Sequence, residues 1–244
     1  MSTTALITGS TSGIGRATAE LLASRGVHVV VSGRSAERGE EVVRGIRAAG
    51  GTADFVRAEL GDAESARALA AAALRIGDGR VDVLVNSAGI FPFGPTADTT
   101  PEGFDEVYDL NVKAPYFLVA ALAPGMAERG TGAIVNVTTM VAEFGAAGMG
   151  LYGSTKAALV LLTKSWAAEF GPSGVRVNAV SPGPTRTEGT AALGEALDQL
   201  AAAGPAGRPG SAQEVAEAIA FLAADAASFV HGAVLPVDGG RIAV

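Results

Sequence analysis

The sequence predicts a doubly wound α/β fold, in which helices cover both faces of one parallel β-sheet. Short apolar runs alternate with helix-like segments along the whole chain of 244 residues. Several runs, such as residues 28–32, are continuous and rich in valine, which is typical of parallel strands that are buried on both faces. No linker-like or low-complexity segment interrupts the alternation, so we expect a single domain over residues 1–244.

The expected elements follow one another in order. Residues 5–8 form the first strand, and an apolar stripe from Ile14 to Leu22 predicts a helix that ends near Gly26. Asp62 stands where the N-cap of a later helix is expected. The other strands are expected at 28–32, 53–58, 81–85, 133–137, 175–180 and 234–237, and the other helices at 36–49, 62–75, 102–129, 152–170 and 212–224.

One stretch, residues 184–209, lacks this alternation. It carries several glycines and prolines, as a mobile connection does. We therefore expect a substrate loop or lid at about 184–209.

The composition argues against several classes of function. A net charge of −7 leaves no basic excess for nucleic acid. With no cysteine and only two isolated histidines, His28 and His231, we expect no metal site. The first residues show no secretory signal, and the longest nearly apolar run, 114–127, is too short to span a membrane. We expect a soluble, cytoplasmic protein.

A glycine-rich turn follows the first expected strand and leads into a helix. It reads Thr8-Gly9-Ser10-Thr11-Ser12-Gly13-Ile14-Gly15, with the spacing G-x-x-x-G-x-G. Glycines at such a turn let the backbone approach a pyrophosphate, whose charge then lies at the helix N-terminus. A merely tight turn is the alternative, but the position at the first strand-to-helix connection favours dinucleotide binding and a Rossmann-type sheet.

The second strand ends in Ser32-Gly33-Arg34-Ser35, where the adenosine ribose of a dinucleotide would lie. No acidic residue is there to bind a free 2′-hydroxyl group, and the guanidinium group of Arg34 suits a phosphate. We therefore predict NADP(H), with NAD(H) less favoured and a solvated arginine as the alternative. Glu59 and Leu60 fall at the expected adenine edge, and the small residues after Asn86 let a cofactor pass close to the strand ends.

Tyr152 and Lys156 lie one helical turn apart, on the same face of the expected helix. A phenol titrates near 10. An ammonium group about 4 Å away is worth roughly 4 kcal/mol at an effective dielectric of about 20, enough to bring the phenol near 7. The pair would then serve as a general acid and base, although two surface residues would show the same spacing. Asn111, inside an apolar helix, marks either a surface position or a backbone distortion or water site near the active centre.

These motifs together resemble the classical short-chain dehydrogenase/reductase family over nearly the whole chain. The family's T-G-x-x-x-G-x-G matches residues 8–15, its N-N-A-G matches 86–89 with Ser87 as the one change, and its helix asparagine matches Asn111. Its Y-x-x-x-K matches Tyr152 and Lys156, its P-G matches 182–183, and its V-D-G-G matches 237–240.

The resemblance implies hydride transfer between NADP(H) and a small carbonyl or secondary-alcohol substrate. A 3-oxoacyl thioester is one candidate substrate, and the alternative function is a non-catalytic NAD(P)-binding sensor or scaffold. The implied catalytic residues are Asn111, Thr139, Tyr152 and Lys156, and Thr139 takes the place of the family's serine. Its extra methyl group predicts a smaller pocket or slower turnover. The implied cofactor-binding residues are Gly9, Ser10, Thr11, Ser12, Gly13, Ile14, Gly15, Arg34, Glu59, Leu60, Asn86, Ala88, Gly89, Tyr152, Lys156, Pro182, Gly183, Thr185 and Thr187.

The substrate side and the assembly are less constrained by the sequence. An apolar substrate is suggested by large side chains near the expected pocket, although the same side chains could pack the loops. These are Phe91, Phe93, Val141, Phe144, Met149 and Leu193. The resemblance implies a homotetramer formed through long helices beside the sheet, with a homodimer as the alternative.

Overall fold

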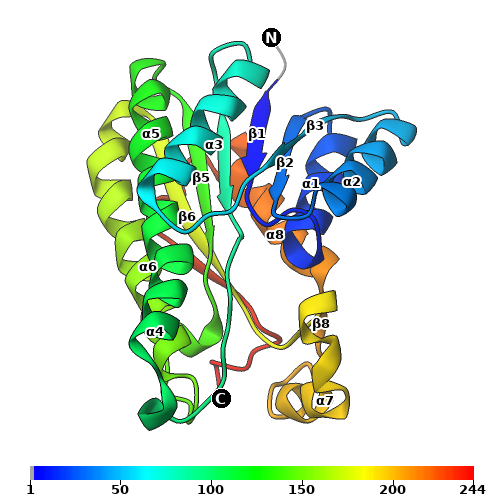
Figure 1. Cartoon of the computed structure of the whole chain (residues 1–244), viewed down its shortest axis with the longest axis vertical. Coiled ribbons are helices and arrows are strands. Elements are labelled where there is room, and N and C mark those ends of the chain that lie inside the picture. Colours follow the sequence, from blue (N-terminus) through cyan, green and yellow to red (C-terminus); the bar gives the residue numbers. More distant parts are fainter. Residues whose placement is uncertain (1–2) are drawn as a thin grey trace.

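Seven parallel strands form the central sheet of the computed structural model, which describes residues 3–244 (Figure 1). Their order across the sheet is β3-β2-β1-β4-β5-β6-β9. The strands are β1 (Thr4–Ile7), β2 (His28–Gly33), β3 (Thr52–Arg57), β4 (Val83–Asn86), β5 (Gly132–Val137), β6 (Val175–Pro182) and β9 (Val234–Val237). The predicted doubly wound parallel sheet is confirmed, with each strand close to its expected bounds.

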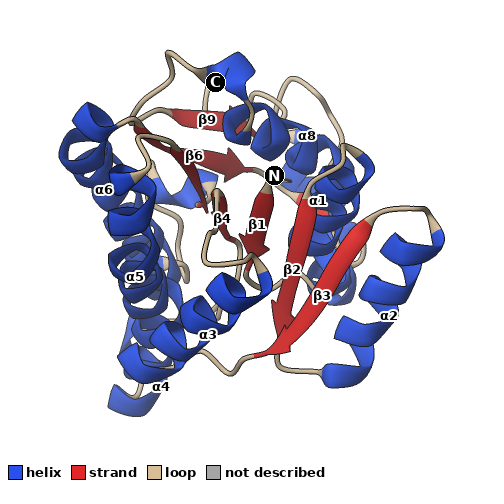
Figure 2. Cartoon of the chain, turned by 90° about the horizontal axis from the view of Figure 1, so that it is seen from above, coloured by secondary structure: helices blue, strands red, loops and turns tan. Residues whose placement is uncertain are grey.

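Helices cover both faces of this sheet (Figure 2). One face carries α1 (Gly13–Ser24), α2 (Ala36–Ala48) and α8 (Ala212–Ala223), and the other carries α3 (Ala63–Ile76), α4 (Pro101–Tyr108), α5 (Ala114–Glu128) and α6 (Gly150–Phe170). Neighbouring side chains of β1 enter different cores, because Ile7 packs with the α1 layer and Leu6 with the α3 layer. Burial on both faces explains why the strands are apolar without alternation.

Local caps fix several helix starts. Asp62 caps α3, where its carboxylate accepts a hydrogen bond from the backbone N–H of Ser65 at 2.7 Å, as the sequence predicts. Ser35 caps α2 in the same way, through the backbone N–H of Arg38. These caps orient the helices that follow β2 and β3, next to the ends of those strands.

The strand order places a crevice between β1 and β4. The chain runs from β1 outward through β2 and β3, then returns to continue on the other side of β1 with β4, β5 and β6. Connections that leave in opposite directions open a crevice at the carboxyl ends of the two strands, where ligands of such sheets bind.

The segment expected to be one helix over 102–129 is divided by a π-helical turn, Asp109–Lys113, between α4 and α5. Asn111 lies in this turn and is fully buried. A π-helical turn inserts one residue into a helix and is frequent at functional sites. Of the two interpretations of Asn111, the structure therefore shows the backbone distortion.

The segment 184–209, predicted as a substrate loop or lid, contains regular secondary structure. The segment holds the short strand β7 (Thr185–Arg186), a 3₁₀ helix (Glu188–Leu193) and the helix α7 (Glu195–Ala202), and β7 pairs with β8 (Gly210–Ser211). Leu197 and Ala201 of α7 are buried, so a short amphipathic helix stabilises the segment. The surrounding glycines and prolines hide this periodicity in the sequence.

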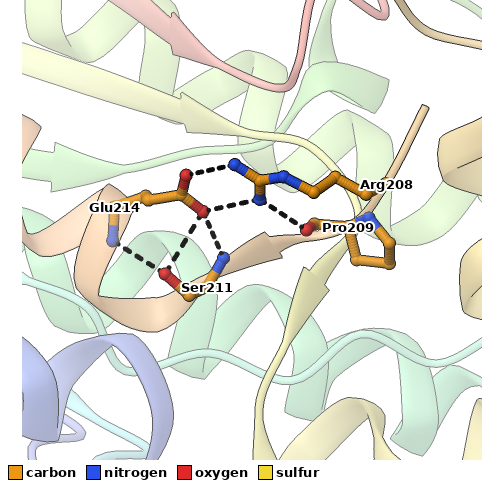
Figure 3. A network of polar contacts seen from close by, with 4 residues as sticks. All are labelled: Arg208, Pro209, Ser211 and Glu214. Carbon is orange, nitrogen blue, oxygen red and sulfur yellow. Dashed lines mark hydrogen bonds and ion pairs between the residues drawn. The ribbon is translucent and has the colours of Figure 1, made fainter. Parts of the chain in front are cut away.

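A polar network anchors the far end of this segment to α8 (Figure 3). Arg208 donates to both carboxylate oxygens of Glu214, at 2.6 and 3.0 Å, and to the carbonyl oxygen of Pro209 at 3.1 Å. Glu214 also accepts from the backbone N–H of Ser211 at 2.8 Å and completes a capping box at the start of α8. Hydrogen bonds from Arg208, and then from Ser211, lower the pKa of Glu214 to about 2.

Candidate active site

A cavity of about 870 Å³ opens at the carboxyl ends of the strands around the β1–β4 crevice. Its walls come from the glycine-rich turn, the ends of β2 to β6, the start of α6 and the segment 182–200. Most of the predicted cofactor-binding residues line it: Gly9, Thr11, Ser12, Gly13, Ile14, Gly15, Arg34, Glu59, Leu60, Ala88, Gly89, Tyr152, Lys156, Pro182, Gly183, Thr185 and Thr187.

The glycine-rich turn is shaped by close backbone packing. Gly9 has a φ of +65°, and a β-carbon there would lie 2.8 Å from the Cα of Ala88. A β-carbon on Gly15 would lie 2.4 Å from the carbonyl oxygen of Gly9. Thr8 fixes the adjacent turn after β4, because its hydroxyl accepts from the backbone N–H groups of Ser87 and Ala88. The turn thus leaves the N-terminus of α1 open to the cavity, a cradle that suits a pyrophosphate.

The part of the cavity beside the end of β2 carries two arginines. Arg34 follows β2, and its backbone carbonyl accepts a hydrogen bond from Nε of Arg57 at 3.1 Å. Arg38, in the first turn of α2, lines the cavity as well and was not anticipated from the sequence. The signal available was a second arginine four residues after Arg34. Two exposed guanidinium groups with no acidic residue at the end of β2 fit a phosphate on the adenosine ribose.

Two predicted cofactor-binding residues, Ser10 and Asn86, do not line the cavity, and their role in cofactor binding stays a prediction. The Ser10 hydroxyl donates to the carbonyl oxygen of Ile7 at 2.6 Å and accepts from the backbone N–H of Ser32 at 2.9 Å. Asn86 is buried and donates to the Asn136 side chain at 2.8 Å. Both side chains satisfy polar groups inside the sheet and its turns, so they support the cavity without lining it.

Thr139, Tyr152 and Lys156 come together on the cavity wall. Thr139 lies just beyond the end of β5, and the other two lie in the first turns of α6. The Thr139 hydroxyl lies close enough to the Tyr152 hydroxyl to lower the pKa of the phenol. Lys156 is only 4% exposed, and its Nζ donates to the carbonyl oxygen of Val137 at 2.9 Å. The same Nζ lies 6.0 Å from the ring centroid of Tyr152.

The expected acidification of the phenol by the ammonium group is wrong for this structure. Burial raises the pKa of Tyr152 to about 12, and the hydrogen bond with Thr139 lowers it only in part. Burial also lowers the pKa of Lys156 to about 8. The loss of hydration dominates both groups, because the ammonium is directed to the Val137 carbonyl and not to the phenol oxygen.

Asn111 lies behind the cavity wall. Its side-chain oxygen accepts from the backbone N–H of Ile90 at 3.0 Å, and its side-chain nitrogen donates to the Ile90 carbonyl at 2.8 Å and to the Thr155 hydroxyl at 3.1 Å. It thereby ties the turn after β4 to α6. A β-carbon on Gly89 would lie 3.1 Å from this oxygen and 3.3 Å from Nζ of Lys156, so Asn111 and Lys156 are close neighbours. Asn111 is in place as a positioning residue.

The apolar part of the cavity contains four of the six predicted substrate residues: Phe91, Val141, Met149 and Leu193. Leu197 and Leu200 of α7 add to it, and they lie within the segment 184–209 that the sequence predicts as a substrate loop. Phe93 and Phe144 do not line this cavity, and their contact with substrate stays a prediction. Phe93 is 77% exposed and packs on Gly148, whereas Phe144 lines a separate shallow pocket and lies under the guanidinium group of Arg241.

Known proteins are similar to this chain over nearly its whole length. A family model described as Enoyl-(Acyl carrier protein) reductase matches residues 9–241. A solved structure described as a short chain dehydrogenase/reductase family protein superposes with a TM-score of 0.92 at 51% identity, covering 99% of this chain and 98% of that one. The chain belongs to the short-chain dehydrogenase/reductase family.

Other members of the short-chain dehydrogenase/reductase family are similar over their full lengths. The cis-4-hydroxycyclohexanecarboxylate dehydrogenase of Sinomonas cyclohexanicum is 43% identical over 245 residues, which is 98% of this chain and 96% of the relative. A blue fluorescent protein from a metagenomic library, solved in complex with NADPH, has a TM-score of 0.92 at 34% identity and covers 98% of this chain and 97% of its own. Family membership makes the protein an NAD(P)-dependent oxidoreductase.

Two further observations concern metal ions and membranes. Among residues 3–244, no group of three or more histidines or acidic residues is arranged to hold a metal ion. No helix in the described part of the chain has both the length and the apolar character to cross a membrane.

Proposed function

We propose that this oxidoreductase transfers a hydride between NADP(H) and a small carbonyl or secondary-alcohol substrate, as a ketoreductase or alcohol dehydrogenase. The observation that carries the proposal is the convergence of two hydroxyl groups, those of Thr139 and Tyr152, on the cavity wall beside buried Lys156. Two hydroxyl groups that converge in a partly apolar cavity can both bind one substrate oxygen.

In the reductive direction the chain's own residues orient the carbonyl and supply a proton. The bound nicotinamide nucleotide supplies the hydride. Thr139 and Tyr152 donate hydrogen bonds to the carbonyl oxygen. With a pKa of about 12, the Tyr152 hydroxyl is protonated at neutral pH and is ready to donate as the oxygen becomes an alkoxide. The ammonium of Lys156, whose Nζ lies 6.0 Å from the centre of the Tyr152 ring, would have to leave the Val137 carbonyl to bind the phenolate that remains.

Comparing the activity of the wild type with that of a variant that lacks the Tyr152 hydroxyl tests this proposal. NADPH oxidation, followed by absorbance, should depend on added ketone and should fall by two or more orders of magnitude in Tyr152→Phe, while NADPH binding stays within about twofold. Tyr116→Phe is the matched control, because Tyr116 is 46% exposed and lies on α5 outside the cavity lining. Full turnover in Tyr152→Phe would contradict the proton-donor role.

The preference for NADP(H) is supported by Arg34 and Arg38 at the end of the cavity beside Glu59. Arg34→Asp places a carboxylate where the 2′-phosphate is proposed to bind. It should raise KM for NADP(H) and lower KM for NAD(H), which reverses the preference. A wild-type KM for NAD(H) equal to or below that for NADP(H) would reject this part of the proposal.

For the substrate we favour cyclic secondary alcohols and their ketones. Support comes from the apolar side chains around the hydroxyl pair, including Phe91, whose ring meets that of Tyr152 edge-on at 6.1 Å. The name of the Sinomonas relative, a dehydrogenase of a hydroxylated cyclohexane carboxylate, points the same way. A 3-oxoacyl thioester is the second candidate because a solved structure that is 51% identical to this chain is described as a betaketoacyl-ACP reductase. Comparing kcat/KM for cyclohexanone, 4-oxocyclohexanecarboxylate and a 3-oxoacyl thioester separates the two classes.

The proposed assembly is a homotetramer. Exposed apolar side chains on the outer helices, Tyr116 of α5 and Leu161 of α6, support it. Light scattering coupled to size-exclusion chromatography measures the mass directly, and a monomer at working concentrations would rule the assembly out.

A further inference from the structure

An acidic side chain from the segment 184–209 contacts the glycine-rich turn. The carboxylate of Glu188 accepts a hydrogen bond from the backbone N–H of Gly13 at 2.8 Å, across 175 residues of sequence. Gly13 is the first residue of α1, a helix of 12 residues. The contact is therefore an anion placed at the positive end of a helix, supplied by a distant part of the chain.

The helix does not cap itself. The side chain of its N-cap residue, Ser12, makes no capping hydrogen bond, and the first turn of α1 contains no acidic residue. Every other long helix that follows a strand directly at this edge, α2 and α3, is capped by its own N-cap side chain. The N-terminus of α1 thus has an open donor group, and Glu188 is the anion that takes it.

The rest of the segment fits closely around this contact. A β-carbon on Gly13 would lie 3.3 Å from the Cβ of Thr187, so residues 187–188 rest directly on the turn. Arg16, in the first turn of α1, feels the negative charge of Glu188 in addition to its ion pairs with Glu20 and Glu41. The Glu188 carboxylate therefore has a favourable charge near it, in Arg16, as well as a close steric fit.

We propose that Glu188 occupies, in the cofactor-free protein, the position that the cofactor pyrophosphate takes, and that this competition sets cofactor affinity. The inference rests on the proposed function, because it requires a dinucleotide to use the N-terminus of α1. One N–H group cannot donate a full hydrogen bond to two anions, and two anions at one helix end repel each other. A dinucleotide consequently binds only to molecules in which Glu188 has left Gly13. Its apparent Kd equals the intrinsic Kd divided by the fraction of such molecules.

The same contact links the two halves of the cavity. Glu188 begins the 3₁₀ helix Glu188–Leu193, which leads through Gly194 into α7 with Leu197 and Leu200 on the apolar wall. Gly194 has a φ of +51°, a backbone conformation that favours glycine. Displacement of the carboxylate by a cofactor would therefore free the segment that forms the substrate wall.

The decisive variant is Glu188→Gln, which keeps the size of the side chain and removes its charge. Its matched control is Glu195→Gln, which removes one charge from the same segment at an exposed position of α7 that does not line the cavity. We expect the Kd for NADPH, measured by its fluorescence, to fall about tenfold in Glu188→Gln and to stay unchanged in Glu195→Gln. A tenfold change corresponds to about 1.4 kcal/mol.

A second measurement reports the contact without any cofactor. Amide hydrogen exchange in peptides covering residues 9–16 should be faster in Glu188→Gln than in the wild type, because the Gly13 N–H loses its charged acceptor. Unchanged or weaker NADPH binding in Glu188→Gln, or exchange equal to the wild type, would overturn the inference.

The two proposals fail in different ways. If neither the wild type nor any variant binds NADPH or NADH, the proposed function is wrong. Inorganic pyrophosphate then still tests whether the Gly13 N–H binds an anion in competition with Glu188. It should bind Glu188→Gln more tightly than the wild type. It should also speed amide hydrogen exchange over residues 187–202, but only in proteins that retain Glu188. Equal pyrophosphate binding by both proteins would reject the competition itself.

Discussion

Replacing Lys156 by methionine should make the protein more stable at neutral pH and remove its activity. Lys156 is 4% exposed, and burial lowers the pKa of its ammonium from 10.5 to about 8. The folded protein therefore holds a charge that the unfolded chain would solvate freely. Methionine has nearly the same length and carries no charge, so it removes this cost and fills the same space.

The size of the effect follows from the pKa. The fall from 10.5 to about 8 costs about 3 kcal/mol of stability at pH 7, at roughly 1.4 kcal/mol per pH unit. The variant also loses the hydrogen bond to the Val137 carbonyl, which lowers its stability by about 1 kcal/mol. The net gain of about 2 kcal/mol raises Tm by roughly 4–8 °C in a chain of this size.

The sign must change with pH. Between about pH 8 and 10.5 the unfolded chain binds the lysine proton and the folded protein does not, so the free energy of unfolding of the wild type rises with pH. The variant lacks this rise. Its advantage should be full below pH 8, shrink through pH 9 and reverse to a loss of about 1 kcal/mol near pH 10.5.

Thermal unfolding at pH 7, 8, 9 and 9.5 measures the difference between the two proteins, and turnover of NADPH measures activity. Lys164→Met is the control, since Lys164 is exposed on the same helix, α6. A variant that is less stable at pH 7 by an amount that does not vary with pH would refute the reasoning. It would mean that the ammonium is as well solvated in the folded protein as in the unfolded chain.

Three further predictions concern the site and its support. Thr139→Ser keeps the hydroxyl that bonds Tyr152 and removes a methyl group, so kcat/KM for bulky ketones should rise severalfold, as a panel of ketones of increasing size would show; a uniform fall would contradict it. Asn111→Leu leaves the Ile90 N–H and carbonyl without their partner and should lower the free energy of unfolding by about 2–4 kcal/mol in denaturant titrations, with kcat falling more than cofactor affinity. Glu214→Gln removes the negative charge that pairs with Arg208, weakens this contact and should speed proteolysis between residues 203 and 210, whereas Glu217→Gln on the same helix should not.

The sheet was predictable because its signals are local. Each strand is a short apolar run, and Asp62 announces the start of α3 through a cap that involves only residues 62 and 65. Tyr152 and Lys156 were found in the same way, because four residues of helix always bring two side chains to one face.

The π-helical turn was not predictable in this way. It exists because Asn111 binds the backbone of Ile90, which is 21 residues earlier in the chain. The inward positions of Ser10 and Asn86 also depend on partners in other strands, Ser32 and Asn136. A sequence pattern shows which residue types are present at a strand end, but the tertiary contacts decide which of them faces the cavity.

The protonation of the site shows the same division between local and tertiary causes. The spacing of Tyr152 and Lys156 gave their proximity, but a carbonyl group of β5 takes the ammonium and burial controls both pKa values. A lysine that is buried at a cost, an asparagine that distorts a helix and a helix end whose cap comes from a distant glutamate are all departures from local stability rules. Each of them touches the cavity or the backbone beside it, whereas the caps of α2, α3 and α8 obey those rules. Stability is thus given up selectively where the cavity needs a charge, a turn or an open donor group, and the Lys156→Met experiment measures one such loss directly.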